Sequence, residues 1–414
     1  MKKVGFVIGL VLILVGVVLF YPKSDNQKML VEDNQFNQNT SLAFYIEQED
    51  GSYTESNTLP STGYTLNTSK SVCSNGTKPK WKNNSLYLSD TINNNMMCYL
   101  FFDIVPPAME IILANKNLAT RADFGKTLTE DTTGTIFYVD LNNNRIYYFA
   151  GNPSDNWVKF AGFYWRIIRI NEDGTIRMIY QGIDANTSGT DTQLSSTSMF
   201  NNAHTDNMYV GYMYQSNQLH GLEINSVIKT NLDNWYQDNL IYYSSYIDKN
   251  AGFCGDRTAY TDSSGVNTGG GIGTTTTYYG AYIRLNNNGS SENAAPTYGC
   301  VDEDLYTLSD GNKGNKALTY PIGLISADEV AYAGGVYGVN NTSYYLYTGQ
   351  TYWTMTPSNY PDAGIFAVSS EGYFYNLWGA TFSWGVRPVV NLRADVQISG
   401  TGTSADPYVV EGAE

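Results

Sequence analysis

An uncharged apolar run near the start of the chain constrains its architecture most. Val4 to Phe20 carry no charge, and Lys2 and Lys3 precede them. As a helix the run would span about 25 Å, slightly less than a ~30 Å hydrocarbon core. The two lysines predict a cytoplasmic N-terminus. The lack of a following A-x-A-like site favours an uncleaved single-pass anchor over 1–23, and a removed signal peptide is the alternative.

Either outcome exports the body of the chain to the extracellular side of the cell membrane. Residues 24–40 are polar and read as a linker, because they hold too few apolar residues to pack. An even number of cysteines in an exported chain predicts disulfides. Three pairings are possible, and the simplest is local, Cys73–Cys98 and Cys254–Cys300. Without a C-x-x-C motif, a zinc site is not expected.

The net charge of the chain limits the kinds of partner that it can bind. The chain has 39 acidic and 24 basic residues, a net charge of −15. This field repels nucleic acid and opposes contact with anionic lipid. We therefore expect an extracellular glycan or protein ligand, no nucleic acid, and membrane contact through the N-terminal segment.

Residues 41–105 carry short apolar runs separated by turn residues, the pattern of a small all-β domain that the first disulfide would hold together. Pro106-Pro107 ends it, because proline donates no ladder hydrogen bond. Apolar spacing then predicts a helix over Ala108–Leu118 within a helical connector at 106–130. The expected strands are Leu42–Ile46, Tyr64–Leu66, Leu86–Leu88 and Cys98–Phe102.

Residues 131–395 predict a larger mixed α+β domain, and 396–414 form a C-terminal tail. Asp173-Gly174 marks the clearest hairpin. Ser326 and Glu329 form an S-x-x-E capping box for a short helix that Gly334 ends. The other expected elements are hairpins at Ile136–Val139/Arg145–Phe149 and Ile365–Val368/Tyr373–Tyr375, a helix over Ser226–Leu240, and strands at Ile322–Ile325, Val386–Leu392 and Tyr408–Val410.

Several motifs of this larger domain resemble a family of bacterial surface domains of unknown function, DUF6273. The resemblance covers about 160–392, and its specificity comes from the order and spacing of the motifs. Domains of this family combine a W-R hairpin, one S-x-I/L helix and a terminal G-V-R-P strand. The matching stretches are FAGFYWRIIRINEDG at 160–174, SVIKTNLDNW at 226–235, YPIGLISADEV at 320–330, YWTMTPS at 352–358, VSSEG at 368–372 and GVRPVVNL at 385–392.

The same order of motifs is similar to C-type-lectin-like domains of the formylglycine-generating-enzyme kind. That resemblance implies a mixed α+β core closed by a terminal strand. Those enzymes use reactive cysteines or bound copper late in the domain, whereas no cysteine follows Cys300 here. DUF6273 domains carry no established activity, so the resemblance implies a fold and leaves the function open.

No catalytic constellation stands out. No G-x-S-x-G motif occurs, and His204 and His220 lie in polar stretches typical of solvated loops. Paired carboxylates could serve a glycosidase. A solvated acidic loop explains 302–304 better, and a helix start explains 328–329. The carboxylates considered are Asp302, Glu303, Asp304, Asp328 and Glu329.

No cofactor is expected, although a structural calcium ion remains possible. Asp140-x-Asn142-x-Asn144 supplies alternating oxygens, but Arg145 stands where an EF-hand loop requires glycine. A hairpin turn explains this stretch better. The acidic run 302–304 is the other candidate for a weak calcium site.

An aromatic stretch between Gly372 and Gly385 is the main candidate for ligand binding. Strand alternation would bury about half of its rings. Exposed tyrosine and tryptophan rings stack on sugars or peptides while their polar atoms hydrogen-bond, and core packing is the alternative interpretation. Arg387 is expected to be a buried structural arginine. The candidate ligand-binding residues are Tyr373, Tyr375, Trp378 and Trp384.

The sequence thus predicts an adhesin-like surface module without catalytic activity that binds a glycan or a peptide. One alternative is an extracytoplasmic enzyme acting on cell-wall or glycan polymers, which a cleft with two or more carboxylates of raised pKa would favour. The other is a structural surface-layer component that self-associates.

Overall fold

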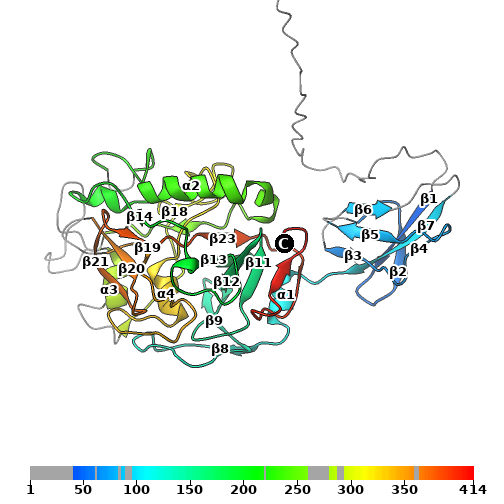
Figure 1. Ribbon diagram of the computed structural model, residues 1–414, viewed down its shortest axis with the longest axis horizontal. Helices are drawn as coiled ribbons and strands as arrows, with labels where there is room; N and C mark the ends of the chain where they lie inside the picture. The colour runs from blue at the N-terminus through cyan, green and yellow to red at the C-terminus, as the bar shows by residue number, and fades with distance from the viewer. Residues whose placement is uncertain are drawn as a thin grey trace, which may run out of the picture.

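The structure, a computed structural model, describes residues 41–60, 63–82, 85–88, 96–218, 221–259, 279–286, 293–358 and 363–414. The predicted anchor (1–23) and linker (24–40) lie outside these residues. Within the described part of the chain, no helix is long and apolar enough to cross a membrane. Figure 1 shows two units: a small sheet of N-terminal strands and a larger unit that holds the rest of the chain.

The small unit is built on a mixed five-stranded sheet and a hairpin. Its strands are β1 (Ser41–Glu47), β2 (Tyr53–Ser56), β3 (Tyr64–Leu66), β4 (Val72–Cys73), β5 (Pro79–Lys82), β6 (Ser85–Leu88) and β7 (Met97–Ile104). The sheet order is β2-β1-β7-β3, β4 also pairs with β7, and β5 pairs with β6. Side chains alternate between the two faces of β7, so Cys98, Leu100 and Phe102 point into a small core. The predicted Cys73–Cys98 disulfide is confirmed and joins β4 to β7.

The connecting segment is less helical than predicted. Helix α1 covers only Ala108–Leu113, so the prediction of a helix to Leu118 is wrong. Leu118 lies instead in β8 (Asn117–Ala119), which pairs in parallel with the strand at 135–141. The polar residues 115–117 offer no further apolar face to bury, and the Asn117 amide donates to the Gly134 carbonyl at 2.8 Å.

The larger unit is centred on a nine-stranded sheet. Its other strands are β9 (Thr135–Leu141), β10 (Asn144–Tyr148), β11 (Trp157–Phe160), β12 (Phe163–Ile170), β13 (Ile176–Gly182), β23 (Val389–Leu392), β24 (Ile398–Ser399) and β25 (Tyr408–Val410). The order is β24-β25-β11-β12-β10-β9-β8, with β13 paired to β12 and β23. The predicted β9–β10 and β12–β13 hairpins are confirmed. Positive φ angles at Asn142 and Asn143 fit the tight turn between β9 and β10.

The C-terminal end of the chain completes this sheet. Tyr408–Val410 forms the predicted last strand, which lies parallel to β11 and antiparallel to β24. The predicted strand at Val386–Leu392 begins only at Val389, because Pro388 has no amide hydrogen to donate. The tail at 396–414 therefore packs into the larger unit, and Val396, Ile398 and Val410 belong to its core.

The remaining elements cover the sheet and form smaller sheets beside it. The helices are α2 (Val227–Asn239), α3 (Gly280–Asn286) and α4 (Ala327–Ala333), with 3₁₀ turns η1 (Gly189–Thr192), η2 (Asn207–Val210) and η3 (Ile241–Tyr246). The strands are β14 (Ser198–Met199), β15 (Met213–Tyr214), β16 (Ile224–Asn225), β17 (Phe253–Cys254), β18 (Leu305–Tyr306), β19 (Tyr352–Pro357), β20 (Gly364–Val368), β21 (Phe374–Gly379) and β22 (Ser383–Trp384). The predicted β20–β21 hairpin is confirmed within the sheet β19-β20-β21.

The predicted helix caps are also confirmed. Ser226 caps α2 by accepting from the Lys229 amide. Ser326 and Glu329 form the full capping box of α4, and Gly334 ends that helix at a φ of 118°. The strand predicted at Ile322–Ile325 is wrong, because only Gly323 makes an isolated bridge, to Val389. The fold is thus mixed α+β and rich in strands, with few helices in the described residues and two disulfides.

Candidate functional site

The predicted ligand-binding stretch begins at Tyr373, just before β21, and extends to β22. Figure 1 shows β21 at the end of the larger unit farthest from the small sheet. Tyr373 and Tyr375 are half-buried and Phe374 between them is buried, as strand alternation requires. Trp384 is half-buried against the main core and lies parallel to the half-exposed ring of Phe382, 6.0 Å between ring centres. Trp378 lies in β21, but its side chain is outside the described part of the structure.

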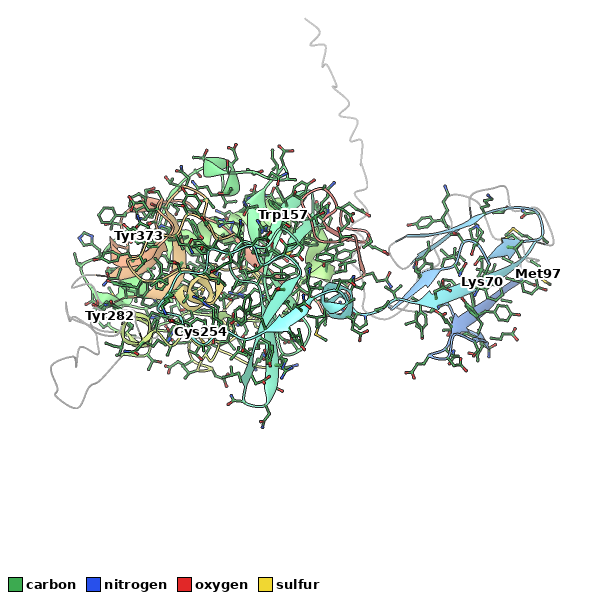
Figure 2. The ribbon with its side chains drawn as sticks, turned by 90° about the horizontal axis from the view of Figure 1, so that it is seen from below. Lys70, Met97, Trp157, Cys254, Tyr282 and Tyr373 are labelled. Carbon is green, nitrogen blue, oxygen red and sulfur yellow. A yellow bond between two sulfur atoms is a disulfide. The ribbon has the colours of Figure 1, made fainter. Side chains whose placement is uncertain are left out.

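Two further tyrosines join this stretch from other segments. Tyr337 follows α4, and its ring lies 4.9 Å from that of Tyr375. Tyr282 of α3 contacts Tyr337 edge-on at 6.2 Å, and Tyr373 contacts Tyr375 edge-on at 6.0 Å. Figure 2 places Tyr282 and Tyr373 at the same end of the molecule. We call Tyr282, Tyr337, Tyr373 and Tyr375 the tyrosine cluster.

A buried asparagine holds the cluster in place. The Tyr337 hydroxyl donates to Asn376 Oδ1 at 2.6 Å, and the Ser358 hydroxyl donates to the Asn376 carbonyl at 3.2 Å. Burial also raises the pKa of Tyr337 well above its ordinary value of 10.0, so its phenol remains a hydrogen-bond donor at neutral pH. The contacts orient Tyr337 before any ligand arrives, which lowers the entropic cost of binding.

The tyrosine cluster can bind ligands by stacking. All four members are half-buried, so part of each side chain is held by the protein and part faces solvent. Such rings offer a rigid apolar face and a polar hydroxyl, which suits the C–H faces and hydroxyls of sugars or the side chains of peptides. The sequence stretch alone could not reveal Tyr282 and Tyr337, because only the fold brings three separate segments together.

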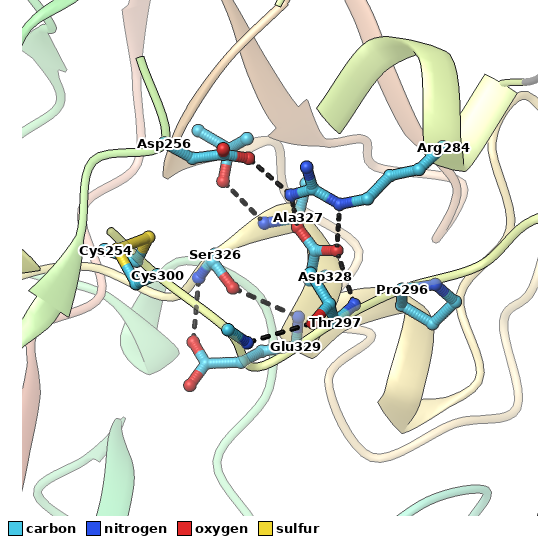
Figure 3. A network of polar contacts seen from close by, with 12 residues as sticks. Cys254, Asp256, Arg284, Pro296, Thr297, Cys300, Ser326, Ala327, Asp328 and Glu329 are labelled. Carbon is cyan, nitrogen blue, oxygen red and sulfur yellow. Dashed lines mark hydrogen bonds and ion pairs between the residues drawn. A yellow bond between two sulfur atoms is a disulfide. The ribbon is translucent and has the colours of Figure 1, made fainter. Parts of the chain in front are cut away.

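The carboxylates considered for catalysis lie elsewhere, beside the second disulfide. Cys254–Cys300 is formed as predicted. Arg284 of α3 holds Asp328 of α4 through two hydrogen bonds of 2.7 and 2.5 Å, and it also pairs with Asp256 (Figure 3). The Thr297 amide donates to Asp328 at 2.9 Å. These contacts fasten the residues near both disulfide cysteines to the start of α4.

Glu329 forms a second ion cluster next to the first. Its side chain is 2% exposed and pairs with Arg177 Nε at 2.5 Å and Arg169 Nε at 3.4 Å. It also accepts the Ser326 amide at 2.8 Å. The pocket between the two ion clusters measures about 30 Å³. That volume holds about one water molecule and no sugar ring.

The two ion clusters shift the pKa values of their carboxylates in opposite directions. Burial raises the pKa of Asp256 above its ordinary value, although Arg284 opposes the shift. Burial alone would also raise the pKa of Glu329, but Arg177 and Arg169 outweigh it and hold that pKa below 4.5. The carboxylates are therefore engaged in ion pairs with arginines that position the chain.

Acid is expected to weaken this arrangement through Glu329. Because its folded-state pKa lies below the unfolded value near 4.5, its contribution to stability is present above pH 4.5. That contribution is lost as the pH falls through the lower folded-state pKa. Between pH 7 and about pH 3, the free energy of unfolding measured by urea denaturation should therefore fall further in the wild type than in Glu329→Gln. Equal losses in both proteins would contradict this role.

The other residues considered as site candidates differ in their surroundings. Asp302 and Glu303 are exposed, whereas Asp304 is buried and accepts the Arg257 amide at 2.8 Å. Asp140 pairs with Arg145 at the β9–β10 hairpin, as the turn interpretation predicted. His204 lies 3.1 Å from the Thr381 hydroxyl, and His220 is outside the described residues.

Arg387 is confirmed as a buried structural arginine. It is fully buried and donates to the carbonyls of Tyr180 and Leu346 at 3.1 and 3.2 Å. It also donates to Gln181 Oε1 at 2.5 Å and lies 4.9 Å from the centre of the Tyr352 ring. In the described ranges, no three His, Cys, Asp or Glu side chains are grouped to hold a metal ion.

Comparison of the chain with protein-family models, with curated proteins and with solved structures finds no match. The resemblances to DUF6273 and to C-type-lectin-like domains stay predictions.

Proposed function

We propose that the protein is a membrane-tethered bacterial surface protein whose larger unit binds an extracellular glycan or peptide without catalysing a reaction. The observation that carries the proposal is the convergence of Tyr282, Tyr337, Tyr373 and Tyr375 on one end of that unit. The N-terminal apolar run supplies the tether, and the small sheet acts as a spacer. The net charge of −15 disfavours nucleic acid as the ligand.

The proposal retains the predicted family and fold. The confirmed hairpins, the capped α4 and the structural Arg387 are consistent with a C-type-lectin-like member of the DUF6273 surface domains. In C-type-lectin-like domains the region corresponding to β21–β22 carries the ligand. Tyr373, Tyr375 and Trp384 are the predicted contact residues with described side chains, and Trp378 remains a candidate beside them.

Tyr375→Ala is expected to weaken ligand binding at least tenfold, because it removes the ring that contacts both Tyr337 and Tyr373. The full chain would first be screened on a glycan array and by peptide display, and the dissociation constant of the captured ligand would then be measured. Tyr242→Ala is the matched control, because Tyr242 is a 91% exposed tyrosine on η3.

Three results would oppose the proposal. Unchanged affinity in Tyr375→Ala would remove the site assignment. Turnover of a captured glycan would favour the enzyme alternative. Self-association of the full chain with no captured ligand would favour a surface-layer component.

A further inference from the structure

A cleft lies between α1 and the turn that joins β24 to β25. Figure 1 shows α1 at the end of the larger unit that is nearer to the small sheet. Its volume is about 700 Å³, within the range of about 300–1,000 Å³ typical of small-molecule pockets. Pro106, Ile111 and Ile112 form an apolar wall on the α1 side. Thr401 and Thr403 contribute hydroxyls on the side of the β24–β25 turn.

A buried ion pair lines the cleft. The side chains of Lys116 and Asp155 are 5% and 7% exposed, and Lys116 Nζ donates a hydrogen bond to Asp155 Oδ2. The same oxygen accepts the Gly134 amide at 2.7 Å. Asp155 Oδ1 has no hydrogen-bond partner in the described part of the chain. A buried pair of this kind is favourable only when its remaining polar atoms are also satisfied.

Tyr408 adds a phenol hydroxyl to the cleft wall. The residue is 3% exposed and lines the cleft. Burial, reinforced by Asp155, raises its pKa to about 12, so the hydroxyl keeps its proton at neutral pH. A phenol that lines the cleft can donate a hydrogen bond to a ligand bound there.

The charges of the cleft select a neutral ligand. A charged ligand would compete with one partner of the Lys116–Asp155 pair, a cation with Lys116 and an anion with Asp155, and would leave the displaced group without its counter-charge. Glu110 on the rim adds a further barrier to anions. Hydroxyl groups both donate and accept, and they match a ligand that also carries hydroxyls.

We infer that this cleft binds a neutral saccharide. A sugar ring would place its C–H face on the α1 wall and its hydroxyls against Tyr408, Thr401 and the Lys116–Asp155 pair. The site shares no residue with the tyrosine cluster, so it does not depend on the function proposed above.

To test this, the full chain is titrated with cellobiose, lactose and N,N′-diacetylchitobiose, and binding is measured by saturation-transfer NMR and calorimetry. Glucosamine and glucuronic acid serve as charged comparison ligands. Ala114→Trp fills the cleft from the exposed end of α1, and Ala122→Trp places the same ring on an exposed loop residue outside the cleft lining. Tyr408→Phe removes the hydroxyl and keeps the packed ring.

At least one neutral disaccharide should bind the wild type and Ala122→Trp. Binding should fall at least tenfold in Ala114→Trp and about threefold to tenfold in Tyr408→Phe, the loss of one hydrogen bond. Tyr375→Ala should bind these sugars as the wild type does, which separates this site from the tyrosine cluster. The inference is overturned if no neutral probe binds, if charged probes bind better, or if Ala114→Trp and Tyr408→Phe bind with unchanged affinity.

Discussion

Replacing Glu329 with glutamine is expected to lower the free energy of unfolding of the larger unit by about 3–5 kcal/mol. The carboxylate is the partner of Arg177 and Arg169 and closes the capping box of α4. Glutamine has nearly the same shape but leaves Arg177, which is 2% exposed, without its counter-charge. A buried charge without a partner is among the few defects that destabilise a protein this strongly.

Urea denaturation followed by tryptophan fluorescence measures the effect. Trp165 and Trp353 are buried in the larger unit and report on it, whereas Trp81 belongs to the small one. Glu303→Gln is the matched control, because Glu303 is exposed and a surface change there should shift stability by no more than about 0.5 kcal/mol. The account of Glu329 fails if the two variants unfold at the same urea concentration.

Removing the Cys254–Cys300 disulfide by a double serine substitution is expected to destabilise the larger unit by about 4 kcal/mol. The two cysteines are 46 residues apart, so the bond restricts a long loop in the unfolded chain. It also keeps Asp256 and Thr297 close to Asp328, where Arg284 completes the ion cluster. The measured loss should therefore appear in the fluorescence transition of the larger unit.

The other disulfide supplies the comparison. Cys73 and Cys98 are 25 residues apart, and removing that bond should cost the small unit about 3.5 kcal/mol. Its removal should leave the transition of the larger unit unchanged, because β4 and β7 belong to a separate core. A loss of stability in both units from either double substitution would contradict this division.

Local chemistry made much of the fold predictable from the sequence. Asp173-Gly174 marks the β12–β13 turn, and Ser326 with Glu329 marks the start of α4. Such signals act within a few residues and depend little on the rest of the chain. The two local disulfide pairings were predictable for a similar reason, since nearby cysteines are the simplest partners.

Tertiary contacts decided the elements that the sequence misplaced. Leu118 fits a helical pattern, yet it lies in β8 because β9 offers a parallel partner. Leu324 and Ile325 fit a strand pattern, but their carbonyls accept from the Arg177 side chain and the Met355 amide. Neither partner can be inferred from neighbouring residues.

The candidate site also combines residues that the sequence points out with residues that only the fold brings together. Tyr373 and Tyr375 are recognisable as aromatic residues two positions apart, one just before β21 and one within it. Tyr282 and Tyr337 are distant in sequence and isolated in composition, so only the packing of α3 and the segment after α4 against β21 joins them to the site. The cleft beside α1 likewise combines α1 with the turn between β24 and β25, which no sequence pattern connects.

Hydrogen exchange of the full chain with and without its captured ligand tests the central claim most directly. Ligand binding at the tyrosine cluster should slow amide exchange in β21 (Phe374–Gly379) and α3 (Gly280–Asn286), and Tyr375→Ala should abolish that protection. The amides of the small sheet should exchange at unchanged rates. Protection confined to the small sheet or to other parts of the larger unit would contradict the account.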